Sequence, residues 1–439
     1  MANPSTPASA QRSPVRLDVA ALPTLRDCGF TGGRNSFRSF CSTVFAADEP
    51  RFLRTDDNDL VVFRHADLRS LGIMPELANV PPAVLFAKVY EQAQAGRPAV
   101  GMAVARVISN QVFTANPPIH GPIRRMLLDQ IGPRQTAQME DLARATVQRI
   151  LEETEGAGEI DLVADVAHRL TARFWAAHLG MTDEEAAATE ACVQSMTPLF
   201  FVERTLDEFR LVDEAFARYG ELVERAALRS LGEGGHPMVE ALAAGLSKID
   251  LEDDPAGAGI VPQNVGALLA GNLFDGFHTA AVAAANTVYT LLRHPEALAT
   301  LRASPHLMER AVFESLRLEP PILYLKRYVS RDIEYDGMLI PEGTLAVMFW
   351  AAGNHDPSAF PAPADFDLSR SHQGLSTFGA GPHICPGRFV AVMLARALLE
   401  TLRDRVEPGL ADEPDAWIDN LAMSQLKTLP LRIRSRARE

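Results

Sequence analysis

The chain has 439 residues, of which 47% are hydrophobic and 22% are charged. These values are ordinary for a globular protein, and the length allows two or three domains or one large fold with a sizeable core. The net charge of −14 argues against general nucleic-acid binding and against binding to an anionic membrane surface, although a local basic patch is compatible with it.

The cysteines and the N-terminal segment indicate where the protein functions. Residues 1–14 are rich in Pro, Ser and Ala, so we expect residues 1–15 to be a disordered tail and residues 16–439 to form a single domain. No apolar run reaches the roughly 18 residues of a membrane-spanning helix, so we expect no membrane anchor. The cysteines show neither metal-type nor disulfide-type spacing, which favours a reducing cytoplasm; they are Cys28, Cys41, Cys192 and Cys385.

The first regular elements along the chain are two strands. Residues 51–54 and 60–63 flank a polar turn and predict a β-hairpin, and a short helix opens at His65. Residues 72–115 carry four prolines and predict a long irregular segment.

A basic pair follows at the start of another helix. Pro122 suits the first helical turn, so His120 lies at the helix start and Arg124 lies one turn later. Two cationic groups one turn apart can bind an anion from the same side, although a basic helix face is more often simply solvated.

Residues 135–235 read as a nearly continuous run of amphipathic helices, interrupted by glycines at 156–158 and 232–235. Three aromatic side chains of this region could reach a ligand, although an aromatic stripe on a helix more often belongs to the plain core. They are Phe200, Phe201 and Phe209.

The longest predicted helix runs from about residue 262 to residue 294 and is about 50 Å long at 1.5 Å per residue. It is long enough to cross the whole molecule. Gly276 and Thr279 in its middle loosen the backbone ladder and permit a local bulge.

A charged pair with apolar flanks comes next. Glu314 and Arg317 share one face of a helix at spacing i, i+3, and there they can form a bidentate pair. Most such pairs lie on the surface, but these flanks predict burial. Residues 336–349 then predict a turn and a strand.

The most informative stretch is residues 378–387, with the sequence FGAGPHICPG. Three glycines and two prolines specify a tight loop that can pass close to something flat and bulky. Cys385 therefore lies on this loop, just before a helix that is apolar on every side. We expect the helix N-terminus to favour the thiolate, a soft ligand suited to haem iron. A buried inert cysteine is the ordinary alternative.

This loop resembles the haem-binding loop of the cytochrome P450 monooxygenases, with its pattern Phe-Gly-x-Gly-x-His-x-Cys-x-Gly. Further matches follow in order from about residue 51 to the C-terminus, including the Glu314-x-x-Arg317 motif. The resemblance implies the cytochrome P450 fold, which is mostly α with a small β region and a long central helix crossing over the haem. It also implies haem b (iron protoporphyrin IX) as cofactor.

The family pattern assigns roles to individual residues. It implies that Cys385 is the axial iron ligand and that Glu314 and Arg317 are structural, with the third partner displaced because Asp365 takes the usual basic position. Phe274 and Ile322 are expected to shape the substrate pocket. The residues expected to hold the haem propionates are His120, Arg124, Arg327 and His383.

The middle of the long helix departs from the family pattern. Counting back from His294 aligns Gly276 and Thr279 with the family's glycine and threonine, but it puts His278 at the acid position and Asp275 at a small-residue position. Either His278 or Asp275 carries protons with Thr279 by another route, or Asp275 binds a polar group of the substrate. His278 pointing away from the haem into a polar contact is a further alternative.

The resemblance implies insertion of one oxygen atom from O2 into a hydrophobic small molecule. Electrons would come from NAD(P)H through separate redox proteins of the ferredoxin and ferredoxin reductase type, because no Gly-x-Gly-x-x-Gly run or flavin-type domain is present. Arg124, Arg125 and Arg388 are candidates for the docking patch. The alternatives are a haem-thiolate enzyme that uses peroxide directly or rearranges its substrate, and a non-catalytic haem carrier.

Overall fold

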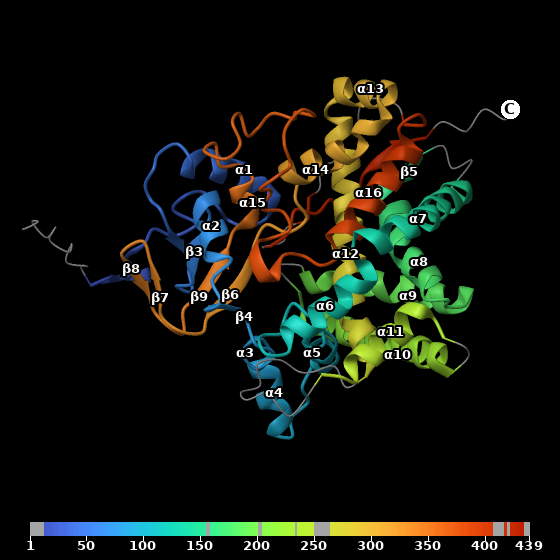
Figure 1. The fold of residues 1–439 in the computed structure, drawn as a ribbon, viewed down its shortest axis with the longest axis horizontal. Helices are drawn as coiled ribbons and strands as arrows, with labels where there is room; N and C mark the ends of the chain where they lie inside the picture. The colour runs from blue at the N-terminus through green and yellow to red at the C-terminus, as the bar shows by residue number, and fades with distance from the viewer. Residues whose placement is uncertain are drawn as a thin grey trace, which may run out of the picture.

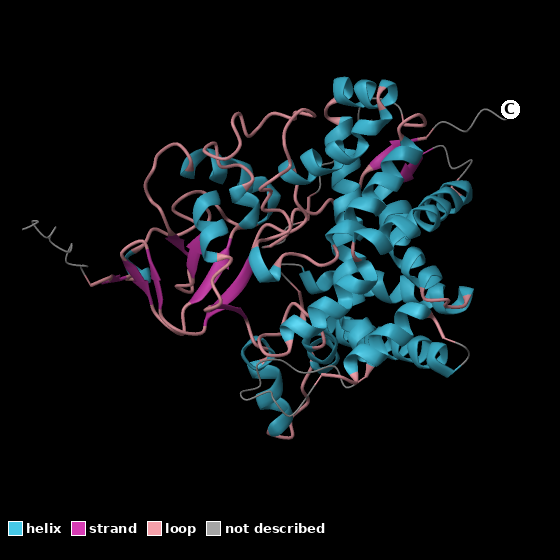
Figure 2. Ribbon diagram, in the orientation of Figure 1, coloured by secondary structure: helices cyan, strands magenta, loops and turns pink. Residues whose placement is uncertain are grey.

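The computed structural model describes residues 13–154, 159–200, 204–232, 235–249, 264–406, 417–418 and 422–433. A large helical body lies beside a smaller sheet-rich part (Figure 1 and Figure 2). This mostly helical fold with a small β region confirms the predicted fold class. Residues 1–12 of the predicted tail lie outside the described residues, and Val15 pairs with Met338 of a neighbouring strand.

The strands form three small sheets, of which the largest has the order β2-β3-β9-β6-β4. In it β3 and β9 run parallel, and the other neighbours are antiparallel. The strands are β1 Val15–Arg16, β2 Leu53–Arg54, β3 Leu60–Val62, β4 Leu77–Asn79, β5 Glu159–Asp161, β6 Leu325–Val329, β7 Ile333–Tyr335, β8 Met338–Ile340, β9 Leu345–Met348 and β10 Pro430–Arg432.

The large sheet is buried on both faces because its side chains alternate. Leu60 and Met348 belong to one hydrophobic cluster, whereas Val61 and Val347 belong to another on the opposite face. The hairpin predicted at 51–63 is present as β2 and β3, and the helix predicted at His65 is α2.

The helices of the N-terminal half are α1 Gly33–Val44, α2 His65–Leu71, α3 Pro82–Leu85, α4 Ala87–Gln94, α5 Met102–Ser109, α6 His120–Ile131 and α7 Pro133–Glu153. The prediction that residues 72–115 form a long irregular segment was therefore wrong. These residues contain β4 and three helices, because Pro82 begins a helix at a position where its missing N–H is not needed.

Among the remaining helices, α12 passes through the middle of the helical body, whereas the short α15 packs against α2 in the sheet-rich part (Figure 1). The remaining helices are α8 His168–His178, α9 Asp183–Met196, α10 Leu206–Gly232, α11 Pro237–Leu246, α12 Val265–Leu292, α13 Pro295–Ala303, α14 Met308–Leu318, α15 Trp350–Gly353 and α16 Arg388–Leu402. A π-helical turn, Leu162–Ala167, leads into α8.

The long helix α12 has 28 residues and begins at Val265, where the Asn264 side chain accepts the Ala267 N–H as an N-cap. Its predicted start at Pro262 lies outside the described residues. Alanines at 280, 281 and 283–285 are buried and let neighbouring helices approach closely. The helix is regular throughout, so the bulge permitted by Gly276 and Thr279 is not present. None of the described helices combines the length and apolar character needed to cross a bilayer.

Candidate active site

The loop that carries Cys385 is held in a shape that only glycine allows at one position. Gly381 has φ +64°, and a Cβ there would lie 2.4 Å from the backbone oxygen of Gly72. The Cys385 N–H donates to the Phe378 carbonyl at 2.8 Å, which closes the loop. Cys385 therefore stands just ahead of α16, as the sequence predicts.

The predicted stabilisation of a Cys385 thiolate by the helix N-terminus is outweighed by burial. Desolvation raises the pKa of the Cys385 thiol to about 11, although the Gly387 amide and the nearby Arg388 and Arg124 favour the charged form. The loop amide and the two arginines thus act in the direction that the sequence predicts, and burial acts against them. A thiolate at this position requires a bound cation such as iron, which deprotonates its sulfur ligand.

Four cationic or basic side chains predicted to bind propionates lie together beside this loop. The His120 and His383 rings lie 4.3 Å apart, and both interact electrostatically with Arg124 and Arg327. Burial is the main reason why the pKa of His120 falls to about 4 and that of His383 to about 3. Both imidazoles are therefore neutral donors or acceptors at physiological pH.

Arg327 is 5% exposed, and burial lowers its pKa to about 10. Neither Arg327 nor Arg124 forms an ion pair with any carboxylate of the described residues. A buried guanidinium without a counter-ion is costly, so this cluster is built to receive an anion. A haem carries two propionate carboxylates, which cationic side chains can bind, and its iron takes a soft sulfur ligand. This cluster and Cys385 therefore fit that cofactor.

Asn79 is a residue of this cluster that sequence reasoning missed. Its Nδ2 lies 3.2 Å from His383 Nδ1 and donates to the Ala115 carbonyl at 2.7 Å, while Asn116 bonds its backbone. Asn79 thus orients His383. No local pattern around residue 79 indicates this, because only the pairing of β4 with β6 brings it here.

Two of the predicted proton-relay residues lie on one face of α12. The Thr279 hydroxyl donates to the Asp275 backbone carbonyl at 2.5 Å, and Gln111 Nε2 donates to Asp275 Oδ1 at 3.0 Å. Burial raises the pKa of Asp275 to about 7. The Asp275 carboxyl also raises the pKa of the Cys385 thiol, so the carboxyl lies within electrostatic reach of the sulfur.

His278 makes different contacts. It is 2% exposed, its Nε2 lies 3.0 Å from Gln425 Oε1, and its ring lies 5.5 Å from that of His168. Burial, together with His168, lowers the pKa of His278 to about 3. The structure thus places this histidine in a buried polar contact, the third of the arrangements that the sequence leaves open.

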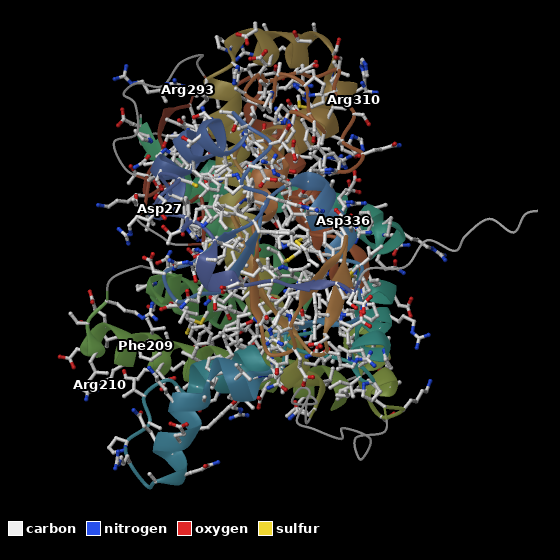
Figure 3. The ribbon with its side chains drawn as sticks, turned by 90° about the vertical axis from the view of Figure 1, so that its left-hand side faces the viewer. Asp27, Phe209, Arg210, Arg293, Arg310 and Asp336 are labelled. Carbon is white, nitrogen blue, oxygen red and sulfur yellow. The ribbon has the colours of Figure 1, made fainter. Side chains whose placement is uncertain are left out.

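The predicted pocket residues lie on different elements. Phe274 is buried on α12, with its ring 4.7 Å from that of Phe216 on α10, and Ile322 bridges to Met423. Phe209 lies at an outer edge of α10, next to Arg210 (Figure 3) and under the Arg204 guanidinium. Phe201 and the Phe200 side chain lie outside the described residues.

The Glu314–Arg317 pair is buried as predicted, with two hydrogen bonds of 2.8 and 2.9 Å. Arg370 is the displaced third partner, since its Nε donates to Glu314 Oε1 at 3.2 Å. At the position that is usually basic, the Asp365 backbone carbonyl accepts a hydrogen bond from Arg317.

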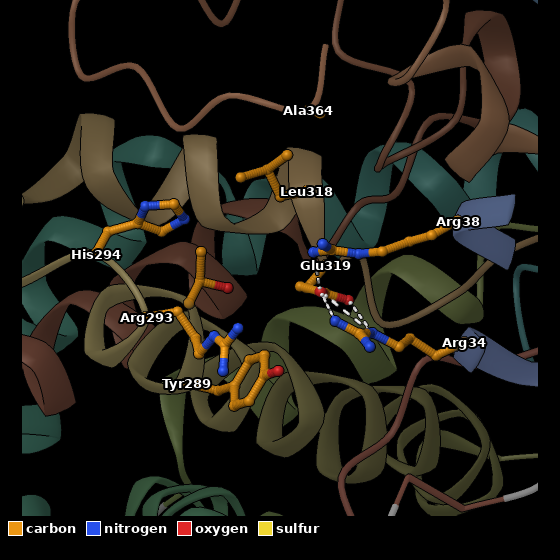
Figure 4. Close-up of a pocket in the computed structure, with 9 residues that line it drawn as sticks. Arg34, Arg38, Tyr289, Arg293, His294, Leu318, Glu319 and Ala364 are labelled. Atoms are coloured by element: carbon orange, nitrogen blue, oxygen red, sulfur yellow. Dashed lines mark hydrogen bonds and ion pairs between the residues drawn. The ribbon is translucent and has the colours of Figure 1, made fainter. Parts of the chain in front are cut away.

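A cavity of about 170 Å³ lies elsewhere, at the C-terminal end of α12 (Figure 4). Its floor is the Glu319 carboxylate, which both Arg34 and Arg38 bind at 2.6–2.7 Å. Because these charges satisfy one another and none of the cysteines lines the cavity, it is separate from the Cys385 site.

The model of the family described as "Cytochrome P450" matches residues 84–405 of the chain. Among curated relatives, a "Biotin biosynthesis cytochrome P450" of Bacillus subtilis is 28% identical over 336 residues, which cover 75% of this chain and 81% of the relative. A "6-deoxyerythronolide B hydroxylase" of Saccharopolyspora erythraea is 26% identical over 333 residues, which cover 75% of this chain and 80% of the relative.

Solved structures share the fold. The crystal structure of CalO2 superposes with a TM-score of 0.76 at 23% identity, covering 91% of this chain and 96% of that one. P450BioI, in complex with an acyl carrier protein that carries hexadec-9Z-enoic acid, gives a TM-score of 0.75 at 21% identity, covering 90% and 98%. The similarity therefore extends across both the helical body and the sheet-rich part.

Proposed function

The chain belongs to the cytochrome P450 family and is a haem-dependent monooxygenase, and from this premise we propose that it oxidises a hydrophobic small organic molecule. The observation that carries the proposal is the combination at one place of Cys385 with the buried Arg327 and the half-buried Arg124, which no carboxylate of the described chain neutralises. The substrate class is supported by Phe274 and Ile322, the apolar residues expected to line the pocket.

Bound haem supplies the activation of O2 and the transfer of one oxygen atom to the substrate. We propose that Cys385 would hold the haem iron through its sulfur. Arg124 and Arg327 would bind the propionates by charge-assisted hydrogen bonds, with His120 and His383 beside them.

We propose that Asp275 is the acid of the proton relay. Its pKa of about 7 lets it hold a proton near neutrality and give it up, which an ordinary aspartate cannot do as readily. Thr279 lies one turn further along the same face of α12 and would share this role. His278 is the weaker candidate, because its Nε2 is engaged with Gln425 and burial keeps the ring neutral.

Separate ferredoxin-type redox proteins are the proposed electron donors, since the chain has no nucleotide-binding run of its own. Of the three arginines predicted to form the docking patch, Arg125 is exposed, whereas Arg124 and Arg388 are half-buried near Cys385. Arg125 is therefore the one best placed to meet an acidic partner. A cytoplasmic location stays a prediction.

Direct use of peroxide is a second candidate, and it is favoured by the carboxyl at position 275. A carboxyl with this pKa is partly ionised at neutral pH, so its carboxylate form can accept a proton from H2O2 and, once protonated, return it. Turnover of one substrate with H2O2 and with a ferredoxin system, compared at equal enzyme concentration, separates the two functions.

The substrate class is tested by titrating the ferric holoenzyme with a panel of terpenoids, steroids, aromatic compounds and polyketides. We expect at least one hydrophobic compound to displace the iron-bound water, which shifts the Soret band, and to yield a product one oxygen atom heavier. A panel in which only polar compounds bind, or in which bound compounds yield no product, contradicts the proposal.

A further inference from the structure

The loop after α5 is fastened to the middle of α12. The Val112 N–H donates to Asn272 Oδ1 at 3.0 Å, and Asn272 Nδ2 donates to the Asn110 carbonyl at 3.2 Å. The backbones approach so closely that a Cβ on Gly271 would lie 2.8 Å from the Asn110 carbonyl carbon. This loop and the helix are therefore in fixed register with one another.

Gln111 stands at the centre of this contact and is 3% exposed. Its Nε2 donates both to the Gly271 carbonyl at 3.2 Å and to Asp275 Oδ1 at 3.0 Å. An amide nitrogen has two hydrogens, so this geometry uses both of them and fixes the direction of the amide. Gln111 is the only residue of the described chain that hydrogen-bonds the Asp275 side chain.

Two titratable groups on other elements interact electrostatically with Asp275, and neither of them is a cation. They are Tyr219 of α10, whose hydroxyl donates to the Ala270 carbonyl, and Cys385 of the loop. Asp275 forms no ion pair with any cation among the described residues. Its orientation therefore depends on the contact with Gln111 rather than on a charge.

We propose that Gln111 is a positioning residue that holds Asp275 Oδ1 as a fixed acceptor and so directs Oδ2 of the same carboxyl toward the oxygen-binding side of the site. The inference rests on the proposed role of Asp275 as proton donor. Proton transfer requires donor and acceptor to meet at hydrogen-bond distance, so a carboxyl free to rotate delivers its proton less often. Gln111 also donates to the carboxylate form and thereby stabilises it.

A merely structural role, in which Gln111 only fastens the loop, makes a different prediction. Asn272 fastens the same loop to the same helix, and its hydrogen bonds of 3.0 and 3.2 Å are to the loop backbone rather than to the Asp275 side chain. Asn272→Leu is therefore the matched control for Gln111→Met, which keeps the length of the side chain but removes its donor. Gln111→Glu is a second variant, which also removes the donated N–H, in case the methionine variant does not retain haem.

The first measurement is an infrared titration of the holoenzyme from pH 5 to pH 9. The C=O band of protonated Asp275 is identified as the band lost in Asp275→Asn. We expect its titration midpoint to rise by about 0.5 to 1 pH unit in Gln111→Met, and further in Gln111→Glu, because the carboxylate loses a donor. In Asn272→Leu the midpoint stays unchanged.

The second measurement is the fraction of NADH electrons released as H2O2 when a ferredoxin system reduces the enzyme. We expect this fraction to rise roughly twofold or more in Gln111→Met and to stay near the parent value in Asn272→Leu. If Gln111→Met and Asn272→Leu had equal effects on both readouts, the positioning role of Gln111 would be overturned, whereas the proposed role of Asp275 would not. If Asp275→Asn changes neither peroxide release nor its pH dependence, the proposed function of Asp275 fails instead.

Discussion

Arg370 Nε lies 3.2 Å from Glu314 Oε1 and completes the buried pair that Glu314 forms with Arg317. Arg370 also donates to the Pro361 and Ala362 carbonyls, so it ties the loop before Cys385 to α14. In the family pattern, the third partner of this pair is the residue before Phe366. Here the third partner is Arg370, four residues after Phe366.

Replacing Arg370 is therefore expected to weaken the part of the core beside the cysteine loop. Arg370→Leu leaves an oxygen of a buried carboxylate with one donor fewer, which costs about 1.5–3 kcal/mol of unfolding free energy. Urea unfolding measures this loss. Arg331→Leu, at an arginine with 73% of its side chain exposed, is the control and should change stability by about 0.5 kcal/mol or less. Equal effects would contradict the assigned contact.

Alanine substitutions at Gly381 and Gly343 distinguish the stability cost of a steric clash from that of backbone strain alone. Both have positive φ, +64° and +83°, but a Cβ meets the Gly72 oxygen at 2.4 Å only at Gly381, whereas nothing lies within 4 Å at Gly343. Gly343→Ala should cost about 1–2 kcal/mol. Gly381→Ala should cost clearly more and should also lower haem retention during gel filtration. Normal haem retention in Gly381→Ala would show that the loop tolerates the shift.

Arg327→Leu should preserve or raise the stability of the apoprotein but lower its affinity for haem. Removing a buried guanidinium without a carboxylate partner relieves desolvation, so the apoprotein should be as stable as the parent or more stable. The same change removes a propionate partner, so haem should dissociate about 10- to 100-fold faster, for a loss of about 1.4–2.8 kcal/mol. Transfer of haem to an apoglobin measures the rate, and an unchanged rate would exclude Arg327 from the haem site.

Buried neutral histidines make stability fall in mild acid. Burial lowers the pKa of His278 to about 3 and that of His355 to about 4, so the folded state binds fewer protons than the unfolded state below the ordinary value of about 6.5. Stability is therefore complete above pH 6.5 and declines as the pH falls, by about 1.4 kcal/mol per histidine at pH 5.5. Unfolding of His278→Gln at pH 7.5 and 5.5 checks this: its pH slope should be shallower than that of the parent.

The sequence predicts best what a short stretch of chain decides by itself. The glycines and prolines around Cys385 specify a tight loop, and the apolar run at the start of α16 predicts a buried helix, both as observed. Residues 72–115 were mispredicted because a proline that ends one element can also begin the next, as Pro82 does at the start of α3.

Contacts made across the fold could not be predicted from the sequence. Gln111, Asn79 and Arg370 each reach the site from a segment whose local pattern carries no signal of it. The pKa of Cys385 depends in the same way on burial, an effect that the sequence does not reveal and that opposes the effect of the Gly387 amide.

The central claim is that the Cys385 sulfur binds haem iron, and the absorption spectrum of the reduced protein under carbon monoxide tests it most directly. We predict the red-shifted Soret band of thiolate-ligated haem in the parent and in Cys28→Ser, and its loss in Cys385→Ser. A parent spectrum typical of histidine-ligated haem, or an unchanged band in Cys385→Ser, would contradict the account.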